Sequence, residues 1–153
     1  MTQTMLLTGL VIGTFLFMEF VAWFTHKYVM HGLLWILHKD HHTPEHQKLE
    51  KNDFFALIFA VPSVVLIFIG HFQNASISFW AGIGIALYGI AYFLYHDVLI
   101  HKRLSLFGAP RGWYFKAIVR AHIDHHTKGK NYGFLFMVPI RYFNEELQKR
   151  KTT

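Results

Sequence analysis

The chain has 153 residues, of which 53% are hydrophobic and 18% aromatic, so it is more apolar than an ordinary soluble domain. It contains no cysteine, which excludes disulfides, a thiolate-ligated haem and a cysteine-held iron–sulfur cluster in this chain. The formal net charge of +6, in so apolar a chain, indicates an anionic membrane surface as partner and no nucleic acid. We expect one domain over residues 1–153.

Three apolar runs predict membrane-spanning helices at about 5–24, 54–72 and 78–95. The first is interrupted only by Glu19, and it is long enough to span the bilayer, without the basic start of a cleaved signal peptide. The second contains Pro62, where we expect a kink that neighbouring helices accommodate. The third is rich in glycine and alanine, which allow close packing of helices.

After the third run no stretch reaches the ~18 apolar residues of a span. Shorter amphipathic stretches at 113–123 and 132–143 are expected at the membrane interface. The alternative is that one of them enters the membrane and forms a fourth span. Residues 26–51 and 96–147 are expected to form cytoplasmic or interfacial helices. The predicted fold class is therefore all-α, an integral membrane helical bundle with three to four transmembrane helices.

The distribution of basic residues predicts the topology. Residues 25–53 and 96–153 hold all 15 lysines and arginines, whereas the N-terminal tail and the turn at 73–77 hold none. By the positive-inside rule the tail and the turn lie outside, and the two basic segments are cytoplasmic. We therefore expect a multi-pass protein of the inner cell membrane.

A repeated histidine pattern dominates the polar part of the chain: H-x4-H and H-x2-HH each occur twice. Residues i, i+3 and i+4 of a helix share one face, so each H-x2-HH motif can converge on one point. Residues five apart on an α-helix diverge by about 140°, so each H-x4-H pair must cross a helix end or serve two ions. Ten imidazoles exceed the three or four ligands of a zinc site, which favours a two-metal centre on the cytoplasmic side. The ten candidate ligands are His26, His31, His38, His41, His42, His96, His101, His122, His125 and His126.

The two remaining histidines are expected to lie away from the metals, His46 in a solvated loop and His71 at the opposite membrane interface. Metal-bound imidazole usually donates its other N–H to an oxygen, and four carboxylates are candidates for such support. Three lie inside or beside the motifs, and the fourth lies two helical turns before the first motif, where it could instead reach towards the interface. These are Asp40, Asp97, Asp124 and Glu19.

Histidine-ligated iron could activate O2, whereas zinc would bind equally well without redox chemistry. No G-x-G-x-x-G motif and no strand pattern occur, so electrons must come from a separate protein. Seven basic residues could dock an acidic donor or contact anionic headgroups: Lys102, Arg103, Arg111, Lys116, Arg120, Lys128 and Lys130. Five residues of the second and third spans could line an apolar slot for a lipophilic substrate: Phe54, Phe55, Phe59, Gly89 and Phe93.

At these motifs the chain resembles the fatty-acid hydroxylase/sterol desaturase superfamily, and within it the bacterial β-carotene 3-hydroxylases. The similarity covers Glu19 to about Phe134, and the matching stretches are His26-Lys-Tyr-Val-Met-His31-Gly32, Asn52-Asp53, Tyr95-His96-Asp97, His101, Pro110-Arg111, Ala121 to His126, and Gly129-Lys130. The resemblance implies two non-haem irons held by the ten histidines, with O2 as cosubstrate. It also implies a ferredoxin-type donor with its reductase, and hydroxylation of β-carotene through β-cryptoxanthin to zeaxanthin.

Other functions compete with this one. A carotenoid ketolase, or a fatty-acid or sterol hydroxylase or desaturase, would use the same metal chemistry, but such relatives have longer chains and different first-motif spacing. A bis-histidine haem protein would need facing histidines inside the spans. A metal transporter would need histidines and carboxylates at the bilayer midplane, where Glu19 stands alone.

Overall fold

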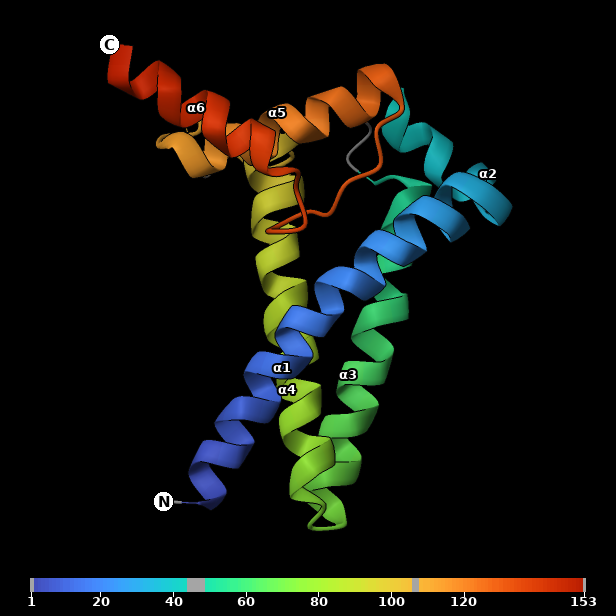
Figure 1. The fold of residues 1–153 in the computed structure, drawn as a ribbon. Coiled ribbons are helices and arrows are strands. Elements are labelled where there is room, and N and C mark those ends of the chain that lie inside the picture. Colours follow the sequence, from blue (N-terminus) through green and yellow to red (C-terminus); the bar gives the residue numbers. More distant parts are fainter. Residues whose placement is uncertain (1, 44–48, 106–107, 153) are drawn as a thin grey trace.

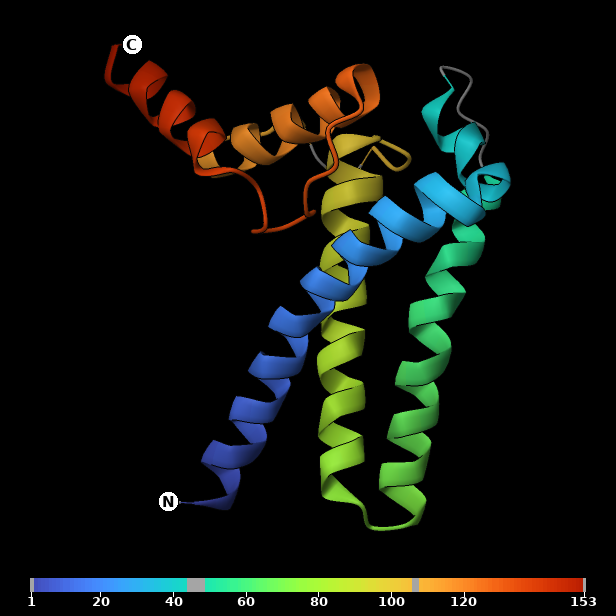
Figure 2. The same cartoon turned by 45° about the vertical axis from the view of Figure 1, so that its right-hand side comes forward.

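The computed structural model describes residues 2–43, 49–105 and 108–152, and all the regular structure in these ranges is helical (Figure 1). His46 lies outside the described residues. Three long helices run side by side, and the shorter helices gather at one end of them, opposite the N-terminus (Figures 1 and 2). The all-α prediction is confirmed.

The long helices correspond to the predicted spans. Helix α1 (Gln3–Phe24) continues into the π-helix η1 (Thr25–Leu33), and α4 (Ser76–Tyr92) continues into the π-helix η4 (Phe93–Ile100). Helix α3 (Phe54–Phe72) contains Pro62 and follows the short 3-10 helix η3 (Lys51–Asp53). With these extensions, three helices are long and apolar enough to cross a membrane, at Gln3–Leu33, Lys51–Phe72 and Ser76–Ile100.

Small residues of α4 let the three spans approach closely, as their composition predicted. A Cβ atom on Gly82 would lie 2.9 Å from the Ser63 carbonyl oxygen of α3, and one on Gly84 would lie 2.7 Å from Cβ of Thr14 in α1. The Ser63 hydroxyl donates a hydrogen bond to the Gly82 carbonyl at 2.8 Å. Glycine at both positions therefore allows α4 to contact α3 and α1 at backbone distance.

The shorter elements cover one end of the bundle. The helix kinks at Gly32, and α2 (Trp35–His38) then leads into the 3-10 helix η2 (Lys39–His42). Helices α5 (Trp113–Lys128) and α6 (Ile140–Thr152) form the C-terminal part. The amphipathic stretch at 113–123 is helical as expected. The stretch at 132–143 differs, because residues 129–139 are not helical and α6 begins only at Ile140.

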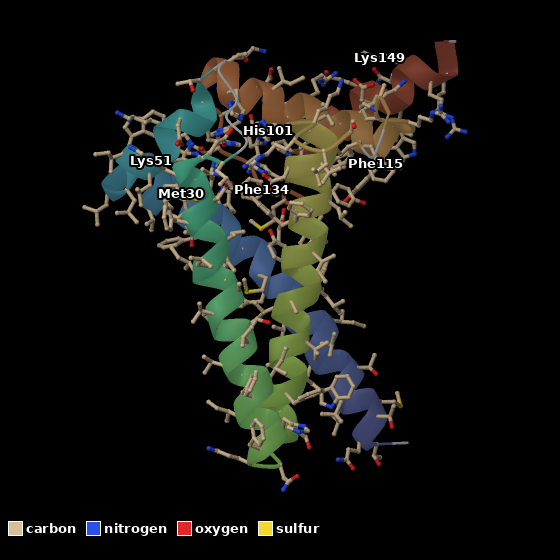
Figure 3. The ribbon with its side chains drawn as sticks, turned by 180° about the vertical axis from the view of Figure 1, so that it is seen from behind. Met30, Lys51, His101, Phe115, Phe134 and Lys149 are labelled. Atoms are coloured by element: carbon tan, nitrogen blue, oxygen red, sulfur yellow. The ribbon has the colours of Figure 1, made fainter. Side chains whose placement is uncertain are left out.

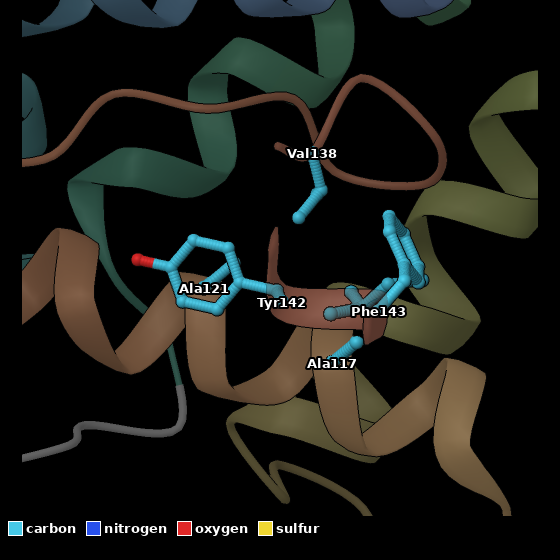
Figure 4. Close-up of a cluster of buried hydrophobic side chains, with 6 residues drawn as sticks. Ala117, Ala121, Val138, Tyr142 and Phe143 are labelled. Atoms are coloured by element: carbon cyan, nitrogen blue, oxygen red, sulfur yellow. The ribbon is translucent and has the colours of Figure 1, made fainter. Parts of the chain in front are cut away.

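The C-terminal helices pack on each other through an apolar cluster of their own (Figure 4). Its buried members are Ala117, Ile118, Ala121, Val138, Tyr142 and Phe143. The Tyr142 hydroxyl donates to the Asp124 carboxylate at 2.7 Å, and Arg120 pairs with Glu146 at 2.9 Å. Asp124, inside the second H-x2-HH motif, therefore ties this part of α5 to α6.

Candidate metal centre

Histidine side chains converge at the end of the bundle that the shorter helices cover. Nine of them form two groups, and within each group the ring nitrogens that offer a ligand atom lie within 4.8 Å of one another. Two ligands on opposite sides of one ion lie about 4.2 Å apart, because a metal–imidazole bond is about 2.1 Å long. Each group thus has the dimensions of a single-ion site. The first group is His26, His31, His38, His42 and His125, and the second is His41, His96, His101 and His122.

The two π-helices explain the H-x4-H spacing. A π-helix closes hydrogen bonds between residues five apart, which places them one turn apart on the same face. The His101 backbone N–H accordingly donates to the His96 carbonyl at 3.0 Å. In both the His26–His31 and the His96–His101 pair the ring centroids are 4.7 Å apart. The structure therefore keeps each pair within one group, by widening the helix that carries it.

The helical spacing predicted that the first H-x2-HH motif converges on one point. This prediction is wrong, because the three histidines divide between the two groups. His38 and His42 belong to the first group, with 3.1 Å between their Nε2 atoms. His41 belongs to the second, where its ring lies 4.2 Å from that of His101. The physical reason is that the motif does not lie on one continuous α-helix: after His38 the chain passes from α2 into the 3-10 helix η2, which changes the directions of the His41 and His42 side chains.

The second H-x2-HH motif, in α5, divides in the same way. His122 belongs to the second group, and His125 reaches the first, where its Nε2 is 3.2 Å from Nε2 of His31. His126 lies between the groups, with its Nε2 2.9 Å from that of His122 and its ring 4.3 Å from that of His42. Each motif thus links both groups into one centre.

His71 is apart from this centre. It is exposed in the last turn of α3, beside Phe72. The groups lie near the start of α3, which is about 25 Å away along the helix axis. His71 therefore lies at the opposite end of α3 from the motif histidines.

Buried ring nitrogens that lack a hydrogen-bond partner indicate whether these histidines are suited to bind metal ions. Among the described residues, both ring nitrogens of His26 and Nε2 of His41 are buried without a hydrogen-bond partner. A buried polar atom without a partner is costly, and a bound cation would satisfy the one lone pair that each neutral ring offers. The facing Nε2 atoms of His101 and His122 are 2.9 Å apart, close to the roughly 3 Å between adjacent ligands of one ion. The donor set fits one divalent transition metal per group.

Two side chains just before α3 orient histidines of both groups. His38 donates its Nδ1–H to the Asn52 amide oxygen at 2.6 Å, and His41 donates its Nδ1–H to the Glu50 carboxylate at 3.1 Å. Since Nδ1 then carries the proton, Nε2 offers its lone pair to a metal. Sequence reasoning missed both roles, because neither residue lies inside a histidine motif. The match of Asn52-Asp53 to the resembling family is a signal that could have found Asn52, whereas no sequence signal pointed to Glu50.

The four predicted carboxylates lie at different distances from the histidines. Asp97 lies beside one of them, with Oδ2 3.5 Å from Nδ1 of His96, and it also pairs with Arg103 at 3.1 Å. Asp40 accepts a backbone N–H from Lys51 at 2.7 Å. Asp124 joins α5 to α6, as described above, and Glu19 bonds Tyr88 and the backbone of residues 134–137. Only Asp97, of these four, contacts a histidine ring nitrogen in the described part of the chain.

Burial keeps the imidazoles outside the spans neutral. Burial lowers the pKa of His38 to about 4, against the opposing hydrogen bond to Asn52 and with a smaller contribution from nearby His31. Burial and the neighbouring His126 lower the pKa of His42 to about 2, and burial with His31 lowers that of His125 to about 3. The pKa values of His41 and His122 fall in the same direction for the same reason. At neutral pH these rings therefore carry free lone pairs.

An apolar cavity of about 440 Å³ lies between α3 and α4, below the histidines. The predicted slot residues Phe55, Phe59, Gly89 and Phe93 line it, whereas Phe54 does not and is 61% exposed. At its upper end Asn52, Tyr92 and Phe134 also line the cavity, and each of them touches a motif histidine. In Figure 3, Phe134 and Met30 of the lining lie at the same end of the bundle as His101.

The fold and the site define a helical protein with three helices able to span a membrane and a histidine-rich candidate metal centre at one end of them. The family model for fatty acid hydroxylase matches residues 11–144, and the chain belongs to that family.

Curated relatives share most of the chain. It is 34% identical over 146 residues to a β-carotene hydroxylase of Paracoccus sp. (strain PC1), which covers 92% of this chain and 90% of the relative. It is 40% identical over 132 residues to one of Pseudescherichia vulneris, covering 83% and 74%. It is 39% identical over 137 residues to a chloroplastic β-carotene 3-hydroxylase of Gentiana lutea, covering 86% and 42%. No solved structure matches the chain.

Proposed function

We propose that the chain is an O2-dependent β-carotene 3-hydroxylase, which converts β-carotene through β-cryptoxanthin to zeaxanthin. The observation that carries the proposal is the apolar cavity whose upper end meets residues touching both histidine groups. The similarity to β-carotene hydroxylases of bacteria and plants supports the same substrate class.

The ten motif histidines would hold two non-haem iron ions, one in each group, with His126 at the border. When bound, iron supplies the one-electron chemistry that O2 activation requires. Each hydroxylation places one oxygen atom of O2 into a C–H bond and releases the other as water, so it consumes two electrons and two protons.

The protein residues bind the substrate, keep water out and orient the ligands. Phe55, Phe59 and Phe93 offer the apolar surface that a polyene needs, and Gly89 leaves room because no atom lies within 4 Å of the Cβ position. Asn52 fixes the ring orientation of His38 at the end of the same cavity. A substrate ring entering from the bilayer would therefore reach the histidines without crossing water.

Electrons would come from a ferredoxin-type protein and its reductase, at the cytoplasmic side of the inner membrane. Of the seven basic residues predicted to dock it, three are engaged in ion pairs: Arg103 with Asp97, Arg120 with Glu146 and Lys128 with Asp124. The other four are exposed and available to an acidic surface. They are Lys102, Arg111, Lys116 and Lys130.

Expression in a host that accumulates β-carotene tests the proposal, with pigments followed by chromatography. We expect zeaxanthin, preceded by free β-cryptoxanthin, because a cavity that presents one ring at a time hydroxylates the two rings in separate binding events. Keto-carotenoids would indicate a ketolase, and unchanged β-carotene would contradict the proposal. Zeaxanthin with no released monohydroxy pigment at limiting enzyme would contradict the separate binding events.

A further inference from the structure

Glu19 is a buried carboxylate in the first span, and its hydrogen bonds lead to a distant loop. Its side chain is fully buried in the described structure, at 0% exposure. Oε1 accepts the backbone N–H groups of Phe134 and Leu135 at 2.8 Å and those of Phe136 and Met137 at 3.1 Å. Oε2 accepts the Tyr88 hydroxyl of α4 at 2.7 Å. All five contacts bring a donor to the carboxylate, which is the arrangement of an anion site.

The loop is shaped to receive this oxygen. Successive backbone N–H groups that point to one place form a concave nest that binds an anion. Here the anion is the protein's own Glu19, more than a hundred residues away in sequence. Gly133, at the start of the nest, is closely packed, because a Cβ atom there would collide with Glu19 Oε1 and lie 2.5 Å from Met137 Cβ. Since residues 129–139 are not helical, this nest gives the loop a fixed position.

Phe134, the first residue held by Glu19, lies between the cavity and the histidines. It is buried, it lines the cavity, and its ring centroid is 5.0 Å from that of His26 in the first group. It is also 5.5 Å from His96 in the second group and 4.8 Å from Tyr92, another cavity residue. Phe134 is therefore a cavity residue in contact with histidines of both groups.

We propose that Phe134 determines which carbon of the substrate ring reaches the metal centre, and that Glu19 is a positioning residue that holds Phe134 in place through the nest at 134–137. This inference rests on the proposed function for its substrate. It assigns Glu19 a role through the loop backbone, whereas the sequence predicted either support of the metal ligands or a side chain that reaches towards the interface.

The product pattern separates this role from a general structural one. Loss of folded enzyme lowers all products together, but movement of Phe134 changes their ratio. We expect Phe134→Leu and Glu19→Gln to raise the share of product hydroxylated away from the main position by about tenfold, because small displacements of a reacting group have effects of this size or larger. Both variants should keep the iron content of the wild type. The matched control is Glu145→Gln, an exposed α6 position, and its ratio should equal that of the wild type.

Hydrogen exchange tests, without any enzymatic reaction, whether Glu19 anchors the loop at residues 134–137. In purified protein the amides of residues 134–137 should exchange about tenfold faster in Glu19→Gln than in Glu145→Gln, since the neutral amide oxygen of glutamine accepts their hydrogen bonds more weakly than the carboxylate does. Gly133→Ala provides a second route if Glu19→Gln does not fold, because the added methyl group displaces the nest and leaves the carboxylate present.

Unchanged exchange of these amides in the folded variants would overturn the anchor. An altered product ratio in Phe134→Leu with a normal ratio in Glu19→Gln and Gly133→Ala would overturn the link between Glu19 and Phe134. A normal ratio in Phe134→Leu would overturn its role in specificity. If the wild type forms no hydroxylated carotenoid, the proposed function fails, while the exchange measurement still decides the anchor.

Discussion

At the scale of single residues, the centre depends on oxygen atoms that fix the histidine tautomers. Glu50 and Asn52 lie two residues apart where the second span begins, and each of them orients one histidine of a different group. Glu50 and Asp53 also form a capping box around η3, so the turn that carries these oxygens is itself held in place. Ligand orientation in both groups therefore depends on one short turn.

The first prediction concerns this turn. Asn52→Ala should weaken metal affinity by about 10- to 100-fold, because His38 loses the acceptor that holds Nδ1–H. Metal titration of the purified variant measures the change, with Asn144→Ala on the exposed face of α6 as the matched control. Equal affinity in the two variants would contradict the role of Asn52.

The second prediction concerns the ligands themselves. Replacing any one of the ten motif histidines with alanine should abolish or severely reduce hydroxylation, because each lies in or between the two groups. His71→Ala, far from the centre, should retain activity, and so should His46→Ala. An alanine scan at equal membrane expression checks this. Full activity in His38→Ala or His126→Ala would contradict a ten-histidine centre.

Histidine spacing was sufficient to predict which residues come together, but it could not assign them to groups. The assignment depends on the direction of each side chain, and the two H-x2-HH motifs lie on different kinds of helix, the first across α2 and the 3-10 helix η2 and the second in α5. The roles of Glu50 and Phe134 were not predictable, because they depend on contacts between segments far apart in the chain.

At the scale of elements, hydropathy predicted the three spans, since apolar length is what a bilayer requires. It could not predict the π-helices, because a change of hydrogen-bond register leaves the apolar pattern intact. The expected helix at 132–143 failed in its first half for a visible reason. Gly129 adopts a left-handed φ of +64°, and the N–H groups of 134–137 turn towards Glu19 instead of forming helical bonds.

The third prediction concerns the packing of α4. Gly84→Leu should destabilise the protein by at least about 1–3 kcal/mol, because the new side chain would collide with Thr14 and the Val11 carbonyl of α1. Gly13→Leu is the matched control in α1, where no atom lies within 4 Å of the Cβ position. Thermal unfolding in detergent compares the two. If both variants unfold at the wild-type temperature, α1 does not pack on α4 at Gly84.

At the scale of the whole molecule, two separate patterns point to the same end. The basic residues and the motif histidines both flank the spans on the side away from the N-terminus and the short turn at 73–77. Metal binding at that end would join the π-helices η1 and η4 to α2, η2 and α5, because the motif histidines lie in or directly after these elements. We therefore expect the metal-loaded protein to be more stable than the metal-free protein.

The fourth prediction follows from the pKa values of the histidines. In the folded protein burial holds the pKa of His38 at about 4 and that of His125 at about 3, against 6.5 for free histidine. The unfolded chain therefore takes up protons that the folded chain does not. Stability should be complete above about pH 6.5 and should fall as the pH drops towards 4. Unfolding temperatures of chelator-treated protein between about pH 7.5 and 5 measure this, and constant or rising stability on acidification would contradict buried neutral histidines.

The central claim is that two histidine groups hold two iron ions that act together on a carotenoid. Titration of metal-free protein with ferrous iron, followed by turnover of β-carotene with an electron donor, tests it most directly. We expect hydroxylation to rise until about two ions are bound per chain, one for each group. His101→Ala, which alters only the second group, should bind about one ion and form no product. Full activity with one ion per chain, or with zinc in place of iron, would contradict the claim.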